Sequence, residues 1–135
     1  MTTAAPLLDN EDVLLSGAED ADQVIDQLAE HNRRRERAEA GLCWWLQCRP
    51  GDEAPALLVG VRGEVGALQW FEGAQTQAPQ QGANGDRVDY FTRWGHHNSV
   101  PPHVEVPLET VHAAVRELAA TGERPTCVQW TEAQP

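Results

Sequence analysis

The sequence predicts a single α+β domain, in which a mostly antiparallel sheet of about five strands carries an N-terminal and a C-terminal helix. Two stretches, 19–38 and 108–121, repeat apolar residues at helical spacing. Short apolar runs bounded by turn residues lie between them and indicate strands. The length of 135 residues suits one domain over 1–135, with 1–8 and 131–135 expected to be frayed.

The first helix is expected over residues 19–38. Val24, Ile25 and Leu28 form a narrow apolar stripe along it. Acidic residues crowd its first turn and arginines its last, which suits the helix dipole at both ends. Gly41 is the expected residue just beyond its C-terminus, where a left-handed conformation commonly closes a helix.

Three strands are expected next, because short apolar runs recur between turn-forming segments. They cover residues 42–48, 56–61 and 64–71. The two-residue link of Arg62 and Gly63 makes a hairpin of the last two. Residues 72–85 are rich in Gly, Gln and Ala, and we expect a flexible loop there.

The second half of the chain is expected to hold two more strands around the second helix. Alternation predicts a strand over 86–92, and Gly, Asn and Pro predict a loop over 93–103. The helix over 108–121 has one continuous apolar face, with Pro107 in its first turn and Gly122 ending it. The last strand should cover residues 126–130.

The charge of the chain is one-sided. Ten basic residues, all of them arginine, face 21 acidic residues, so the formal net charge is −11. Such a field repels phosphate backbones and anionic lipids, so we expect no direct nucleic-acid partner and no membrane, whereas basic protein partners are attracted. The N-terminus does not resemble a signal peptide, and no apolar run approaches the roughly 18 residues of a membrane span. The three cysteines show no disulfide-like spacing. We therefore expect a protein of the reducing cytoplasm.

Catalytic motifs are weak in this sequence. The segment His103-Val104-Glu105 has the H-x-E form of zinc deaminases, with Cys127 downstream. That site needs two cysteines one helical turn apart, and the position three after Cys127 is Trp130. His96 and His97 likewise lack a paired ligand motif. We therefore expect no enzyme, no metal and no cofactor, and a zinc enzyme using His103, Glu105 and Cys127 is the alternative.

Residues 105–130 carry a family resemblance. The segment Glu105-Val106-Pro107-Leu108, the pair Ala114-Val115, and the run Thr121-Gly122-Glu123-Arg124-Pro125 before Trp130 resemble the closing part of Imm1 immunity proteins. Upstream, Leu58-Val59-Gly60-Val61 and Val88-Asp89-Tyr90-Phe91 are similar to the family's hairpin and middle strand. The resemblance implies an antitoxin of a bacterial polymorphic toxin system. Its partner would be the C-terminal domain of a cognate toxin, often a basic nucleic-acid deaminase whose active site it blocks.

Contact residues for such a toxin are predicted from position alone. Exposed Trp, Tyr and Arg side chains are the usual hot spots of interfaces. The residues at predicted strand ends and loops are Trp94, Arg93, Tyr90, Asp89 and Glu72. Trp44, Trp45 and Trp130 lie on predicted strands and are assigned to the core. An acidic adaptor, or a subunit of a complex that contains no toxin, is the alternative function.

Overall fold

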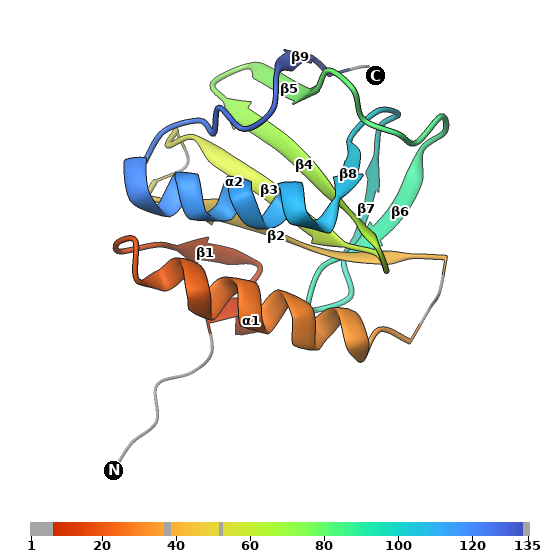
Figure 1. Ribbon diagram of the computed structural model, residues 1–135, viewed down its shortest axis with the longest axis horizontal. Coiled ribbons are helices and arrows are strands. Elements are labelled where there is room, and N and C mark those ends of the chain that lie inside the picture. Colours follow the sequence, from red (N-terminus) through yellow and green to blue (C-terminus); the bar gives the residue numbers. More distant parts are fainter. Residues whose placement is uncertain (1–6, 37–38, 52, 134–135) are drawn as a thin grey trace.

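The computed structural model describes residues 7–36, 39–51 and 53–133. Within them it is an α+β fold in which two helices lie against one curled, mixed sheet of nine strands (Figure 1). The α+β class agrees with the prediction, whereas the number and pairing of the strands do not. The prediction of about five mostly antiparallel strands is wrong, because four strands were missed and two strands run parallel to a neighbour.

Three long strands form the centre of the sheet. They are β2 (Gly41–Gln47), β3 (Ala56–Val61) and β4 (Val65–Glu72). Each is antiparallel to the next, and every residue of β3 is buried. The link between β3 and β4 is closed by the Arg62 amide, which donates to the Val65 carbonyl at 2.7 Å, and by Gly63 with φ of 75°. These central strands follow the prediction closely.

The remaining strands are short and complete the two edges. They are β1 (Asp12–Leu14), β5 (Gln75–Pro79), β6 (Val88–Phe91), β7 (His97–Val100), β8 (Glu105–Pro107) and β9 (Trp130–Glu132). The outer edge of β2 pairs in parallel with β6 at its N-terminal end and with β1 at its C-terminal end. The outer edge of β4 pairs antiparallel with β8 at its N-terminal end and with β5 at its C-terminal end. Strands β7 and β9 then extend β6 and β5.

Several expected boundaries change accordingly. The segment 72–85 holds β5 rather than only a flexible loop, and 93–103 holds β7. The last strand begins at Trp130 instead of residue 126. Most of the missed strands are polar and three to five residues long, and backbone pairing with a neighbour defines them.

The two long helices are α1 (Asp20–Arg33) and α2 (Leu108–Thr121), which lie side by side on one face of the sheet (Figure 1). A short 3-10 helix, η1 (Leu7–Asp9), contacts α1. Helix α2 covers the predicted residues and ends at Gly122 with φ of 73°. Pro107, predicted in its first turn, is instead the last residue of β8 and precedes the helix. Helix α1 ends earlier than predicted, and residues 37 and 38 lie outside the described residues. Gly41 is the first residue of β2 and not a helix cap.

Apolar side chains form two cores, one on each face of the sheet. The larger core lies between the sheet and the helices and contains Trp44, whose ring nitrogen donates to the Leu8 carbonyl at 2.9 Å. The smaller core lies inside the curl of the sheet. Its buried members are Cys43, Leu58, Ala67, Ala78, Tyr90, Val100 and Val104. The curl therefore encloses part of the helix-free face.

Candidate partner-binding surface

The five predicted contact residues do not form one site. Arg93 and Trp94 are exposed at the tip of the β6–β7 hairpin. Asp89 is exposed on β6, where its Oδ1 lies 2.7 Å from Nε2 of His97. Glu72 is exposed at the far end of β4 and accepts a hydrogen bond from the Trp70 ring nitrogen at 2.9 Å. The structure thus brings Arg93 and Trp94 together and leaves Glu72 apart from them.

Tyr90 is fully buried, so its side chain is not available to a partner at the surface. Its hydroxyl donates to Oε2 of Glu105 at 2.7 Å. Glu105 is 3% exposed and is also held by Arg62, with Nε 2.6 Å from Oε2 and Nη2 2.7 Å from Oε1. The prediction that Tyr90 contacts a partner directly does not fit this burial, because its ring fills the smaller core.

This buried network keeps Glu105 ionised. Burial alone would raise the pKa of its carboxyl, but the hydrogen bonds from Arg62 and Tyr90 outweigh burial and lower the pKa. Burial and the bond to Glu105 raise the pKa of the Tyr90 hydroxyl. All three groups are therefore held in one protonation state near neutral pH, which suits a structural role.

The residues of the zinc alternative do not converge. Glu105 is engaged by Arg62 and Tyr90, whereas His103 is exposed and its Nδ1 lies 3.2 Å from the Gly82 carbonyl. Cys127 is exposed on the segment between α2 and β9. Among the described residues, no group of three or more His, Cys, Asp or Glu side chains is placed to hold one metal ion.

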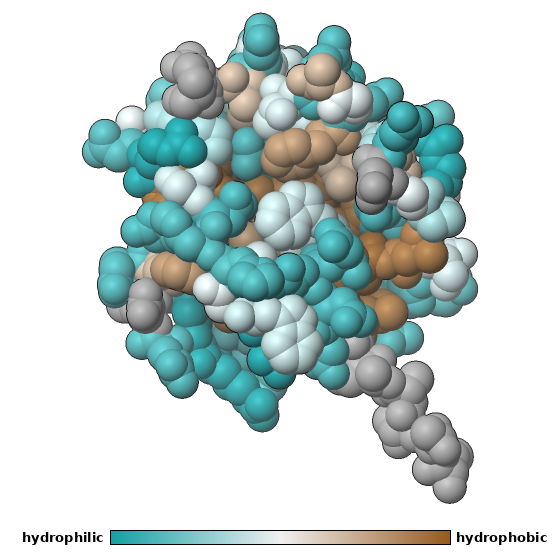
Figure 2. All heavy atoms as spheres, turned by 180° about the vertical axis from the view of Figure 1, so that it is seen from behind, coloured by the Kyte–Doolittle hydropathy of each residue, from teal (hydrophilic) through white to brown (hydrophobic). Residues whose placement is uncertain are grey.

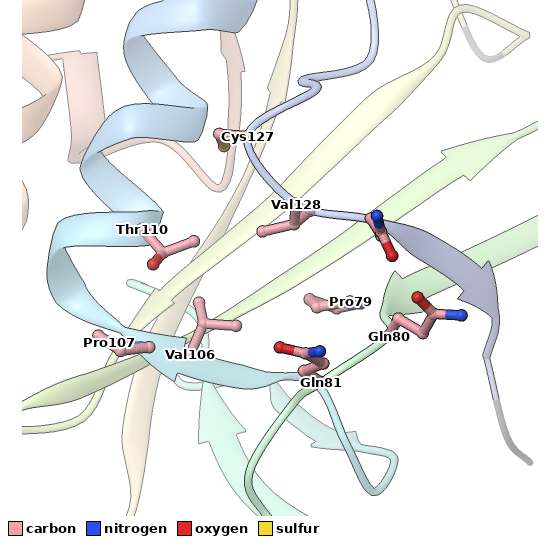
Figure 3. A pocket seen from close by; sticks show the side chains of 9 residues that line it. Pro79, Gln80, Gln81, Val106, Pro107, Thr110, Cys127 and Val128 are labelled. Carbon is pink, nitrogen blue, oxygen red and sulfur yellow. The ribbon is translucent and has the colours of Figure 1, made fainter.

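Cys127 lines a cavity of about 390 Å³ between the start of α2, β8 and the segment leading to β9 (Figure 3). Figure 3 shows Val106, Pro107 and Thr110 on one side of it and Pro79 and Gln80 on the other. Burial, and next the nearby Glu117 carboxylate, raise the pKa of the Cys127 thiol. The lining offers amides, a hydroxyl and this unactivated thiol, but no acid–base pair for catalysis.

The hairpin tip is held by one carboxylate. Oε1 of Glu11 accepts a hydrogen bond from the Thr92 hydroxyl at 2.5 Å and lies 2.7 Å from Nδ1 of His96. The Gly95 amide donates to the Thr92 carbonyl at 2.9 Å, and Gly95 has φ of 87°. Trp94 is 64% exposed in this ordered turn, with the guanidinium carbon of Arg93 5.7 Å from its ring centroid.

Positive charge gathers on one side of this tip. A cleft of about 560 Å³ lies between the end of α1 and the hairpin, with Arg34, Arg35 and Arg93 in its lining against one acidic residue, Glu36. Arg34 is also paired with Glu30. Burial, and then the charge of Arg93, lower the pKa of His31 in the same lining. The cleft is a local basic region on a protein of net charge −11.

An aromatic surface lies on the helix-free face of the sheet. Trp45 and Phe71 are half-buried beside the smaller core and line a hollow of about 630 Å³ with Glu53. Figure 2 views the molecule from behind the helices and shows hydrophobic and near-neutral residues in the middle and right of this face, between hydrophilic ones. Leu14 on the neighbouring strand β1 is 51% exposed.

Sequence reasoning assigned Trp45 to the core and did not single out Leu14 or Phe71. One signal was available, because adjacent Trp44 and Trp45 on a strand must face opposite sides of the sheet. Trp44 faces the helices, so Trp45 faces away from them. Leu14 carried no such signal, because β1 was not predicted.

Comparison with known protein families gives a match over most of the chain. The family model described as immunity protein Imm1 matches residues 9–132, which is nearly the whole chain. No curated protein matches. Within the described residues, neither helix has the length and apolar character needed to cross a membrane.

Proposed function

Because the chain belongs to the Imm1 family of immunity proteins, we propose that it binds and neutralises a cognate bacterial toxin that is a nucleic-acid deaminase acting on cytosine. The partner is the C-terminal domain of that toxin, met in the cytoplasm. Binding covers the active site or the surface that holds the nucleic acid. The match of the family model over residues 9–132 is the observation that supports the immunity role, and the deaminase as toxin is the finer part of the proposal.

The charge of the chain supports a partner of this kind. A deaminase that acts on a nucleic acid must hold phosphates, so its binding surface is expected to be basic. A protein of net charge −11 is steered toward such a surface and repelled by the nucleic acid itself. The acidic protein therefore competes with the substrate for the same basic groups.

Two exposed side chains at the hairpin tip also support the binding of a protein partner. Trp94 and Arg93 are solvent-exposed on a turn held by Glu11, so little conformational freedom is lost when a partner covers them. Tryptophan and arginine are the residues most often found as interface hot spots.

The test is an assay of the toxin-like domain encoded beside this gene. Cytosine deamination is measured on single- and double-stranded DNA, with and without an equimolar amount of this protein. We expect stoichiometric loss of activity and a co-eluting complex. A non-cognate acidic protein of similar charge is the control, because a nonspecific polyanion would also inhibit.

Two outcomes would contradict separate parts of the proposal. Undiminished activity with no complex would overturn neutralisation by direct binding. A complex that protects cells from a toxin without deaminase activity would keep the immunity function and reject the deaminase as partner.

A further inference from the structure

We propose that the helix-free face of the sheet, together with the tip of the β6–β7 hairpin, is the surface on which the toxin docks, and that it receives a basic patch of the toxin. The inference rests on the proposed function and adds the place and the chemistry of the contact. We name this surface the docking face. It consists of Asp12, Leu14, Trp45, Glu53, Phe71, Arg93 and Trp94.

The register of the strands places the apolar members on one side of the sheet. Val13 is paired with Leu46, and both belong to the core under the helices. Their neighbours Leu14 and Trp45 therefore point to the other side, because side chains alternate along a strand. On β4, Leu68 and Trp70 face the helices, so Phe71 shares the side of Trp45.

The hairpin tip joins this surface through Glu11. The Glu11 carbonyl accepts a hydrogen bond from the Trp45 amide at 2.8 Å, while its carboxylate contacts Thr92 and His96. The next residue, Asp12, is the register partner of Trp45. A chain of direct contacts thus leads from the turn that carries Trp94 to β1 and Trp45.

The apolar exposure of the described chain is concentrated here. Leu14, 51% exposed, and Trp94, 64% exposed, are the large hydrophobic residues that stand open to solvent among the described residues. Leu14 is the last residue of β1, next to half-buried Trp45 on β2, and Trp94 lies in the turn that Glu11, just before β1, contacts through Thr92 and His96. Clustered apolar exposure on a soluble protein marks interaction sites more often than isolated residues do.

Two of the three charged residues of the docking face are acidic, Asp12 and Glu53, and the third is Arg93, which lines the cleft beside α1. The proposed occupant places its basic groups against the two carboxylates. Asp12 and Glu53 are exposed, and neither has an ion-pair partner among the described residues. Arginine and lysine side chains bring apolar stems as well as a positive head, so they suit an apolar centre with carboxylates beside it. A cation can also lie over the face of an exposed tryptophan. Such side chains are expected where a toxin holds phosphates.

A second copy of this chain fits the docking face less well. A symmetric dimer through this surface would bury the same face, with two carboxylates and one arginine, on both copies. Like charges placed face to face disfavour association, and the net charge of −11 on each copy adds to this. A toxin with a basic surface meets no such penalty.

The first test removes the apolar anchors. Calorimetry with the toxin domain compares the full chain with Leu14→Ala, Trp94→Ala and the double variant. We expect each single change to weaken binding by about 30-fold, as for an interface hot spot. Thr110→Ala, in the cavity beside α2, is the matched surface control and should bind as the wild type does. Unchanged thermal unfolding shows that the variants are folded.

The second test separates local charge from net charge. Association rates are compared for Asp12→Asn with Glu53→Gln, and for Asp26→Asn with Glu109→Gln on the exposed sides of the helices. Both pairs remove two negative charges. The first should slow association by about 10-fold at low salt and the second much less. Equal slowing by both pairs would overturn the docking face, because net charge alone would then explain the rate.

The outcomes distinguish this inference from the proposed function. Wild-type protein that fails to bind the toxin at all would overturn both. Wild-type binding that Leu14→Ala and Trp94→Ala leave unchanged would overturn the docking face alone. Self-association in sedimentation that these two substitutions abolish, with toxin binding intact, would assign the surface to a second copy instead.

Discussion

Arg62 and Glu105 form a bidentate ion pair in which Nε lies 2.6 Å from Oε2 and Nη2 lies 2.7 Å from Oε1. The pair joins the link between β3 and β4 to strand β8, and Tyr90 ties β6 to the same carboxylate. Glu105 is almost fully buried, whereas the Arg62 side chain is 28% exposed. Loss of Arg62 would leave a buried charge without its partner, whereas loss of Glu105 would leave a charge that water can reach.

Replacing Arg62 by Ala should destabilise the fold by about 2–3 kcal/mol. The change leaves a buried carboxylate without its charge partner, and the partial exposure of Arg62 reduces the cost below that of a fully buried pair. Tyr90→Phe removes one hydrogen bond to the same carboxylate and should cost about 1–2 kcal/mol. Urea denaturation measures both, and a loss below about 0.5 kcal/mol for Arg62→Ala would contradict the structural role given to the pair.

Acid should destabilise the protein partly through Glu105. Its pKa is lower in the folded state than the ordinary value of 4.5, so its ionised form stabilises the fold above that value and the contribution is lost as pH falls below it. In Glu105→Gln this part of the pH dependence is absent. The slope of the unfolding free energy against pH, measured from pH 6 downward to about 3, should be shallower in the variant than in the wild type. Identical slopes would show that other carboxylates account for acid unfolding.

Gly60 and Gly41 should be intolerant of a side chain because the ring of Tyr90 lies against both. A Cβ on Gly60 would come within 2.6 Å of Cε2 of Tyr90, and one on Gly41 would also meet that ring. Gly60→Ala should cost about 1–3 kcal/mol through overpacking. In a Tyr90→Leu background the cost should be smaller, because the ring is gone. Strictly additive costs in this double-mutant cycle would contradict the contact.

The same glycines show what the sequence could and could not reveal. Helix α2 was predicted because its apolar residues keep a helical period from Leu108 to Leu118 and Gly122 stops it. Gly41 was misassigned as a helix cap, since nothing local indicates that the distant Tyr90 needs the space above it. Helix α1 was predicted too long for a similar reason. The Asn32 side chain bonds both the carbonyl and the amide of Gly63, a contact set by the hairpin.

The candidate surface was only partly visible in the sequence. Trp94 beside Gly95 in a polar stretch indicated an exposed aromatic residue, and the structure places it at a turn. Leu14 could not be assigned, because β1 is three residues long and is defined by pairing with β2. Tyr90 was expected at the surface because the sequence did not reveal which strands lie next to its own. The curl of the sheet buries its ring in the smaller core.

Glu11 should set the order of the hairpin tip. In Glu11→Ala, the Thr92 hydroxyl and the His96 ring lose their common partner, so the turn around Trp94 loosens. Hydrogen exchange of the His96 amide, which donates to the Thr92 hydroxyl at 3.0 Å, should accelerate. Glu64→Ala, which removes an exposed acid at the β3–β4 turn, is the control. Unchanged exchange in Glu11→Ala would mean that the turn is held by its backbone bonds alone.

The thiols of Cys127 and Cys43 should react at different rates. Cys127 is exposed, whereas Cys43 is buried, and burial raises the pKa of Cys43 to about 12. A thiol reagent should modify Cys127 first in the folded protein and reach Cys43 only on unfolding. Cys127→Ser should remove the fastest phase. Rapid modification of Cys43 in native protein would contradict the closed smaller core.

Titration of this protein into the purified toxin domain by calorimetry tests the central claim most directly. Neutralisation by direct binding predicts a one-to-one complex whose affinity falls as salt rises, because part of the attraction lies between acidic and basic surfaces. Absence of heat and of a complex, with both proteins folded and the toxin active, would contradict it.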